Sequence, residues 1–281
     1  MSELLERLRA AQQRRSPLVM GVLNVTPDSF SDGGLDADTE AAVARALAMV
    51  DAGATLIDIG GESTRPGAEE VGVDQELSRV VPVITRLSAV SDTLISIDTS
   101  KPEVMLAAVE AGAVMINDVR ALTQAGALAV AVASPAMICL MHMQGQPASM
   151  QARPQYEDVV AEVGAWLAER AQKVIEAGAS AERIVLDPGF GFGKTVAHNY
   201  QLLARLASLT ALGYPVLAGL SRKSMLGAVT GRAEPQQRVA ASVAGAVLAA
   251  QAGAALVRVH DVAETVDALA VLAATVEHQS G

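Results

Sequence analysis

The sequence predicts a single α/β domain folded as a closed (β/α)₈ barrel, and three observations support this. The chain has 281 residues, close to the roughly 250 that eight strand–helix units need. No linker rich in Pro, Gly or Ser and no abrupt change of composition divides it. Apolar runs alternate with helical patterns, which is typical of a parallel sheet covered by helices. An open doubly wound sheet is the alternative that periodicity leaves open.

A repeated tetrapeptide indicates how the units are paired. Four times, a polar residue followed by Ala-Gly-Ala closes a helical segment and precedes an apolar run. Gly adopts the left-handed backbone that ends a helix without strain. The spacing of about two strand–helix units predicts eight strands, of which the marked ones are even-numbered. The four marks are Asp51–Ala54, Glu110–Ala113, Glu176–Ala179 and Gln251–Ala254.

The apolar runs have the length and composition of buried strands. Short aliphatic side chains dominate them, as parallel strands covered on both sides require. The helix that begins near Pro102 is expected to take Thr99 or Ser100 as its cap. Helices are also expected at Thr39–Asp51 and Tyr156–Ala177. Strands are expected at Leu18–Val25, Thr55–Gly60, Leu94–Asp98, Val114–Asp118, Ala136–Met141, Ile184–Asp187, Pro215–Gly219 and Ala255–His260.

Charge and composition exclude several classes of protein. A formal net charge of −10 leaves no basic surface for nucleic acid. Cys139 is the only cysteine, so no intrachain disulfide can form and a cytoplasmic location is expected. Residues 1–17 are read as a polar N-terminal segment, without the features of a secretory signal, that precedes the catalytic domain at 18–281. Two uncharged stretches, 121–141 and 239–257, are read as helix–strand pairs, so no membrane partner is expected.

Polar side chains lie at the carboxyl ends of six of the eight predicted strands. These ends form the rim where barrel enzymes place their catalytic groups. One Asp after a strand often caps the next helix, but several of these residues lie inside the predicted strand. The set therefore predicts a ligand pocket. It comprises Asn24, Asp58, Asp98, Asn117 with Asp118, Asp187, and Arg258 with His260.

The kinds of polar group indicate what the pocket could bind. Carboxylates such as Asp98 and Asp187 can accept paired N–H donors from a guanidine-like heterocyclic edge, as in an aminopyrimidinone. Lys223 follows the seventh predicted strand and can donate to a ring oxygen or nitrogen. The segment Ser221–Ser224 around it can equally be an ordinary exposed helix start.

Three cations at the same rim can hold an anionic leaving group. They are Arg65, Arg258 and His260, and such groups stabilise developing negative charge. Along the sequence, the pair at the eighth strand has no adjacent carboxylate except Asp261.

Two rim loops are expected to be flexible. Residues Thr26–Gly34, after the first strand, and Gly61–Gly67, after the second, are rich in turn formers. Rim loops of this composition commonly act as lids, and plain surface turns are the alternative.

The segment Pro188–Thr195 is one residue away from a Walker A loop. Pro188 stands where the first Gly of that motif belongs, and Pro lacks the N–H that a phosphate cradle uses. Asp187 beside bound phosphates would also be unfavourable. Nucleotide hydrolysis is therefore rejected.

Eight segments, in order, resemble the signatures of the dihydropteroate synthase family. The resemblance runs from about Val19 to the C-terminal helix. It implies a barrel fold, usually homodimeric, that serves folate synthesis. The segments are Met20–Gly34, Ile57–Gly67, Ser96–Pro102, Ile116–Asp118, Leu140–Met143, Leu186–Lys194, Ser221–Ser224 and Arg258–Val262.

Carried over position by position, the resemblance implies a role for each rim residue. Lys223, Arg258, His260 and Arg65 are expected to be catalytic. The pterin ring would be held by Asp98, Asn117, Asp187, Lys223 and Met141. The diphosphate would be bound by Thr64, Arg65, Arg258, Val259 and His260, with Mg²⁺ at Asn24. The aminobenzoate pocket would be formed by Phe30, Thr64, Pro66, Phe192 and Ser224.

The implied reaction condenses (7,8-dihydropterin-6-yl)methyl diphosphate with 4-aminobenzoate. We see no activated nucleophile, so we expect a dissociative displacement in which the ring stabilises a methylene cation. Two alternatives stay open. A methyltetrahydrofolate-type methyltransferase shares the pocket but would not need Arg258 and His260. A catalytically inactive pterin-binding barrel should have lost a cation or Asn24, and all of these are present.

Overall fold

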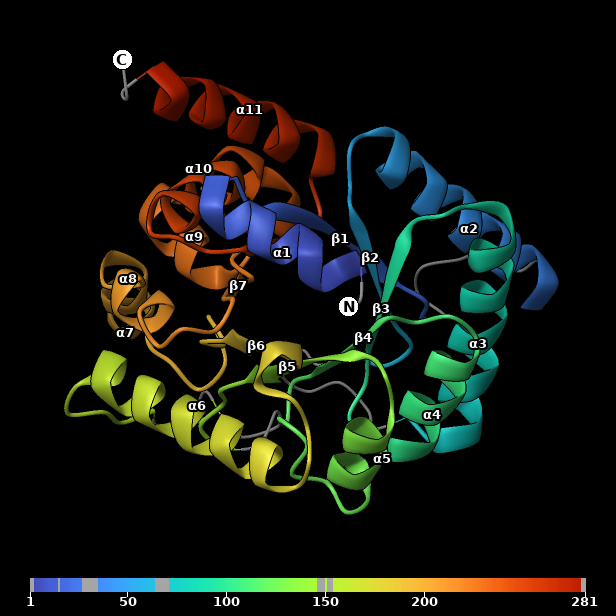
Figure 1. Cartoon of the computed structure of the whole chain (residues 1–281). Helices are drawn as coiled ribbons and strands as arrows, with labels where there is room; N and C mark the ends of the chain where they lie inside the picture. Colours follow the sequence, from blue (N-terminus) through green and yellow to red (C-terminus); the bar gives the residue numbers. More distant parts are fainter. Residues whose placement is uncertain are drawn as a thin grey trace.

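The computed structural model describes residues 3–14, 16–26, 35–63, 71–145, 150 and 154–278. In this part of the chain, eight parallel strands form one sheet in the order β6-β5-β4-β3-β2-β1-β8-β7. The sheet curls until β6 meets β7 at the bridge between Leu186 and Val216. Helices surround it as an outer ring (Figure 1). The predicted barrel is confirmed, and the open sheet is excluded.

The strands lie within the predicted runs. The difference is greatest at the seventh, where only two residues of the predicted five form a regular strand. The strands are β1 (Leu18–Asn24), β2 (Leu56–Gly60), β3 (Leu94–Asp98), β4 (Met115–Asp118), β5 (Met137–Met141), β6 (Ile184–Asp187), β7 (Leu217–Ala218) and β8 (Leu256–Val259).

The helices follow the strands around the barrel. Short 3₁₀ turns at Ala181–Arg183 and Pro235–Arg238 join some of them. The helices are α1 (Glu3–Arg14), α2 (Leu35–Asp51), α3 (Val73–Val90), α4 (Pro102–Glu110), α5 (Ala127–Ala133), α6 (Val159–Glu176), α7 (Val196–Ala204), α8 (Ala207–Thr210), α9 (Ser224–Thr230), α10 (Val239–Gln251) and α11 (Val262–His278).

The expected cap of α4 is wrong. The N-cap residue is Lys101, and its side chain forms no capping hydrogen bond. The Ser100 hydroxyl instead donates to the Asp118 carboxylate, and the Thr99 hydroxyl accepts from the Lys101 N–H at 3.2 Å. The Ser100 hydroxyl, which the local sequence predicted as a helix cap, is therefore bound to a buried carboxylate on the next strand.

The four Ala-Gly-Ala marks behave as expected. Gly53, Gly112, Gly178 and Gly253 have φ between 94° and 121°, a region that side chains disfavour. At the first mark, the Ala54 N–H donates to the carbonyl five residues earlier at 2.9 Å, which is the bond that closes a Schellman motif. Each mark precedes an even-numbered strand.

Strand side chains alternate between two apolar cores. One set, such as Ile57, Ile95 and Ile116, packs outward against the helices. The other set, such as Leu56 and Met115, fills the lower interior of the barrel. This alternation is the period of two that an extended strand imposes.

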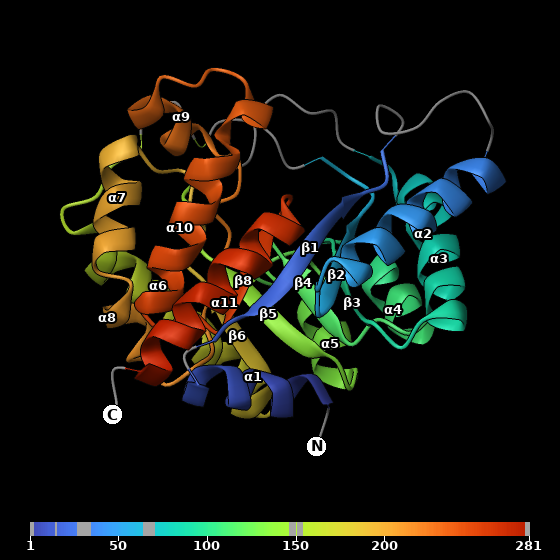
Figure 2. The same ribbon diagram turned by 90° about the horizontal axis from the view of Figure 1, so that it is seen from above.

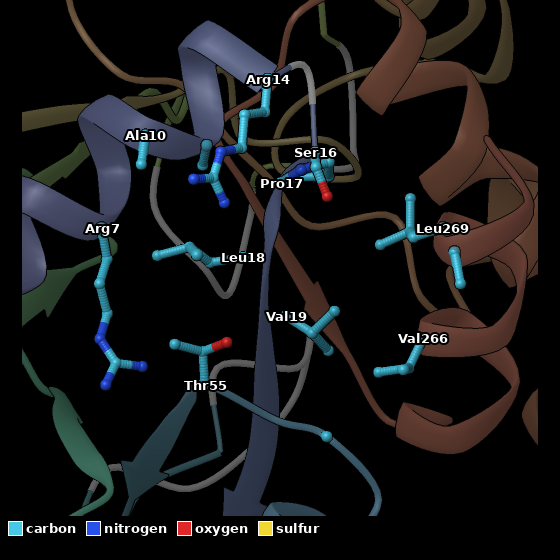
Figure 3. Close-up of a pocket in the computed structure, with 13 residues that line it drawn as sticks. Arg7, Ala10, Arg14, Ser16, Pro17, Leu18, Val19, Thr55, Val266 and Leu269 are labelled. Atoms are coloured by element: carbon cyan, nitrogen blue, oxygen red, sulfur yellow. The ribbon is translucent and has the colours of Figure 1, made fainter. Parts of the chain in front are cut away.

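Helix α1 closes the amino end of the barrel. Leu4, Leu5 and Leu8 are buried among the interior side chains, and Figure 2 shows the helix across one end, opposite α9. A hollow of about 490 Å³ lies beside it, between β1 and α11, with Arg7 and Arg14 at its edge (Figure 3). The segment predicted as polar thus carries an apolar face, while the domain boundary at residue 17 stays a prediction.

The two uncharged stretches form helix–strand pairs. Residues 121–141 include α5 and β5, and residues 239–257 include α10 and the first half of β8. Among the described helices, none combines the length and apolarity needed to cross a bilayer.

Leu8→Ala is expected to lower the free energy of unfolding by about 2–4 kcal/mol, because it leaves a cavity under the barrel floor. Leu8 is fully buried, whereas Gln12 on the same helix is exposed. Urea denaturation of Leu8→Ala beside Gln12→Ala measures the difference. Equal stabilities would show that α1 does not contribute to the core.

Candidate active site

Polar side chains replace the apolar interior at the carboxyl end of the barrel. On β3, Leu94 belongs to the floor, while Ser96 and Asp98 follow at intervals of two and so face the same side. On β2, Leu56 and Asp58 are likewise two residues apart and so face the same side. Asn117, Asp187 and Arg258 follow floor residues of their own strands in the same way: Met115, Val185 and Leu256. The predicted rim residues therefore share the barrel mouth.

Arg258 lies across two carboxylates at this mouth. Its Nε is 2.5 Å from Asp58 Oδ2, and its Nη2 is 2.7 Å from Asp98 Oδ2. Asn117 Nδ2 also donates to Asp58 Oδ2, at 3.1 Å. These carboxylates are far from Arg258 in the sequence, where Asp261 is the only adjacent one. The strand turns Arg258 inward, and Asp261 pairs with Arg222 instead, at 2.5 Å.

The mouth has more negative than positive charge at this point, because two carboxylates share one guanidinium. Burial lowers the pKa of Arg258, but Asp58 and Asp98 outweigh it and raise that pKa above its ordinary value. Burial raises the pKa of Asp98 to about 7, although Arg258 opposes the shift. Asp58 Oδ1 is buried without a hydrogen-bond partner in the described residues. These oxygens are acceptors ready for a ligand with N–H donors.

Asp58 was predicted as a member of the rim pocket but was assigned no ligand, and the structure shows that it holds other rim residues in place. It is fully buried and holds both Arg258 and Asn117. The available signal was a charged residue in the middle of a buried apolar strand, which needs a partner.

Asp187 and Lys223 face each other on the opposite side of the mouth. Asp187 Oδ1 accepts from the Gly189 N–H at 2.7 Å, and burial raises the pKa of this carboxyl group. Lys223 Nζ donates to the Phe190 carbonyl and lies 4.8 Å from the centre of the Phe192 ring. Burial lowers the pKa of Lys223 to about 8, and Asp187 opposes that shift.

Met141 ends β5 beside Asp187, its partner in the sheet register. Its side chain is buried at the same end of the barrel as the polar groups. It therefore provides an apolar surface next to them.

His260 is held by a serine that sequence reasoning missed. The His260 N–H donates to Ser221 Oγ at 3.1 Å, and His260 Nδ1 lies 3.0 Å from the same oxygen. Ser221 precedes the Arg-Lys pair, so the segment after β7 positions both Lys223 and His260. The side chain of Val259 belongs to the outer core, which leaves its backbone for any contact at the mouth.

Asp118 has a structural role. It accepts from the Ser100 hydroxyl and from the N–H groups of Arg120 and Leu122, at 2.8 and 2.7 Å. Asp118 therefore supports the turn after β4, although it does not cap the next helix, whose N-cap is Gly126.

The remaining predicted residues are only partly placed. Ser224 is exposed at the start of α9, and Phe192 is half-buried. Phe30, Thr64, Arg65 and Pro66 lie outside the described residues. Most of the two loops expected to be flexible lies outside them as well.

Asn24 offers one oxygen ligand at the end of β1. Its side chain is half-buried at the same end of the barrel as the other polar groups. No group of three His, Cys, Asp or Glu residues there could hold a metal ion. Mg²⁺ commonly uses one or two protein oxygens, with substrate phosphates and waters completing its shell. The residues present therefore fit Mg²⁺ that arrives with a diphosphate.

Comparison with known proteins gives a consistent result. Residues 20–260 match the family model described as pterin binding enzyme. The dihydropteroate synthase of Escherichia coli strain K12 is 52% identical over 259 residues, which cover 92% of each chain.

Two solved structures of Xanthomonas albilineans dihydropteroate synthase have the same fold. The one with 4-aminobenzoic acid has a TM-score of 0.88 and 57% identity. The one in complex with 7,8-dihydropteroate has a TM-score of 0.85 and 55% identity. Each alignment covers 93% of this chain and 94% of the other.

Asp98→Asn is expected to stabilise the fold at pH 8 but much less at pH 5. Because the pKa of Asp98 in the folded protein, about 7, exceeds its ordinary value of 3.8, wild-type stability falls as pH rises from about 4 to about 7. Asn does not titrate, so the advantage of the variant should grow across that window to roughly 1–3 kcal/mol. Urea denaturation at both pH values measures it.

Asp51→Asn, at an exposed carboxylate at the end of α2, is the control and should change stability little at either pH value. A pH-independent gain for Asp98→Asn would contradict the raised pKa.

Proposed function

We infer the reaction from the family and the rim site together, since the chain belongs to the dihydropteroate synthase family of pterin-binding enzymes. The enzyme is a transferase. It condenses (7,8-dihydropterin-6-yl)methyl diphosphate with 4-aminobenzoate to give 7,8-dihydropteroate and diphosphate.

We propose that Asp98, Asn117, Asp187 and Lys223 bind the pterin ring, with Met141 packed beside it. The observation that carries this proposal is the convergence of buried carboxylates whose pKa values are raised by desolvation. An aminopyrimidinone edge presents N–H donors, and hydrogen bonds to charged groups contribute roughly 1.5–3 kcal/mol each. Asp98 binds Arg258 through one oxygen, so its other oxygen is left for the ring.

The leaving group is assigned to the cations of the rim. Arg258 and His260 would contact the diphosphate, together with Thr64, Arg65 and the backbone of Val259. The ion pairs of Arg258 with Asp58 and Asp98 keep its guanidinium charged and oriented at the mouth. Mg²⁺ held by Asn24 would supply further positive charge to the diphosphate when it is bound.

The displacement follows from this arrangement of charges. The bond between the methylene carbon and the diphosphate oxygen breaks, and its electron pair leaves with the diphosphate. The carboxylates of Asp98 and Asp187 stabilise the positive charge that develops on the ring and its methylene group. The neutral amine of 4-aminobenzoate then forms the new C–N bond and loses a proton to water. Phe30, Thr64, Pro66, Phe192 and Ser224 are proposed to shape the pocket for this second substrate.

A homodimer and a cytoplasmic location complete the proposal. Helix α10 has no charged side chain between Val239 and Gln251 and packs between α9 and α11 (Figure 1). Leu248 of this helix is 51% exposed, Val229 of α9 is 62% exposed and Val271 of α11 is 68% exposed. A helix that is apolar on all sides is usually buried, so we assign this face to a second copy of the chain.

Diphosphate release on addition of 4-aminobenzoate to enzyme and pterin diphosphate tests the reaction. Asp187→Asn is expected to weaken pterin binding about 10–150-fold, corresponding to one charged hydrogen bond, and to leave folding intact. Asp158→Asn, which changes a carboxylate that caps α6, serves as the control with normal turnover. Normal pterin affinity in folded Asp187→Asn would refute the ring site. A wild-type enzyme that releases no diphosphate would refute the function.

Leu248→Arg is expected to convert the dimer to monomers, because the charge would be buried at the interface. Sedimentation velocity of the variant and the wild type measures this. Arg205→Ala, a change on a different face after α7, should stay dimeric. A dimer that survives Leu248→Arg would place the interface elsewhere.

A further inference from the structure

We propose that Lys194 is a positioning residue for the condensation: its buried amine shapes the loop after β6, and that loop places Lys223 and Phe192 at the barrel mouth. The inference rests on the roles proposed above for those two residues.

Lys194 belongs to the segment Pro188–Thr195, the near match to a Walker A loop. In a nucleotide-binding loop the lysine reaches out to phosphates. Here it is 3% exposed and its amine is directed into its own loop. Its Nζ lies 2.9 Å from both the Gly189 and the Phe192 carbonyl oxygens. One amine therefore joins the two ends of the turn from Gly189 to Phe192.

The same amine ties this turn to the end of β5. Lys194 Nζ is 3.3 Å from the His142 carbonyl oxygen and 3.0 Å from His142 Nδ1. The backbone passes so close here that a Cβ on Gly189, which has φ of +66°, would lie 1.9 Å from the His142 oxygen. The loop is thus pressed against β5 with Lys194 as the link between them.

The residues enclosed by this link make contacts of the active site. The Gly189 N–H donates to Asp187, the Phe190 carbonyl accepts from Lys223 Nζ, and the Phe192 ring lies beside the same amine. All three contacts come from the four-residue turn whose ends Lys194 holds. A change in the shape of the turn would therefore move the partners of Lys223 and Asp187 together.

An apolar side chain could not replace this amine without cost. Three carbonyl oxygens and an imidazole nitrogen surround an amine that has at most three N–H donors, so its removal would leave buried acceptors without a donor. Burial lowers the pKa of His142 to about 3, helped by Lys194, so the ring is neutral and Nδ1 can accept. Burial also lowers the pKa of Lys194 to about 7, although Asp187 opposes this and Lys223 adds to it. The lysine does not serve as a free cation for a phosphate.

The test compares Lys194→Met with Tyr156→Phe. Lys194→Met keeps the length of the side chain but removes its donors. Tyr156→Phe removes a hydrogen bond of 2.9 Å to Gly193 in the same loop and leaves the carbonyl cluster intact. Both variants should lower the melting temperature. Only Lys194→Met should also raise the KM for 4-aminobenzoate and the Kd for pterin diphosphate, each by about tenfold or more.

A second variant keeps the test decisive if Lys194→Met does not fold. Asn199 accepts from the Gly191 N–H at 2.7 Å and so holds the same turn from α7. Asn199→Ala should shift the same KM and Kd in a folded protein. Normal KM and Kd in either folded variant would overturn the proposal, and so would shifts in Tyr156→Phe that equal those of Lys194→Met. The wild-type enzyme is measured in the same assay. If it turns over normally, the proposed function stands and these outcomes count only against the role of Lys194.

Discussion

The strands fill the interior of the barrel with side chains at successive levels, and the whole site depends on which residues occupy each level. The lowest level is apolar and is covered by α1 through Leu4, Leu5 and Leu8. Water is kept from that end, so the polar groups can be gathered at the other. The carboxylates of the mouth then lie directly above an apolar layer. Burying a charge there costs free energy unless the charge has a partner.

That constraint explains why the mouth contains one cation between two carboxylates. Arg258 binds one oxygen of Asp58 and one of Asp98, and in the described residues it leaves Asp58 Oδ1 without a donor. Under the proposed ring site, a bound pterin would bring N–H donors to a mouth where acceptors are in excess. These buried carboxylates lower the stability of the fold, and they lie where a ligand with N–H donors would need acceptors.

Much of the fold could be predicted because its determinants are local. The strand period, the apolar runs and the glycines after the helices act within a few residues, and Gly53 shows this directly. The rim was predictable as a set of polar residues at strand ends. The partners of Arg258 were not, since Asp58 and Asp98 lie 200 and 160 positions away in the chain. Ser221 was missed for the same reason, since its partner His260 lies 39 positions away. Lys194 was considered only as part of the near match to a Walker A loop, although two of its contacts, to Gly189 and Phe192, are local.

The backbone hydrogen bonding between neighbouring strands is not uniform around the barrel. The seam of the barrel is the bridge between Leu186 and Val216, next to the two-residue strand β7, while the other strand pairs are joined by longer ladders. Cooperative units separate most readily where backbone hydrogen bonds are fewest. Asp187 stands on one side of this seam, and Lys223 stands on the other. Brief parting of the barrel along that line would separate Asp187 from Lys223, so a ligand bound by both side chains would also hold β6 to the segment that follows β7.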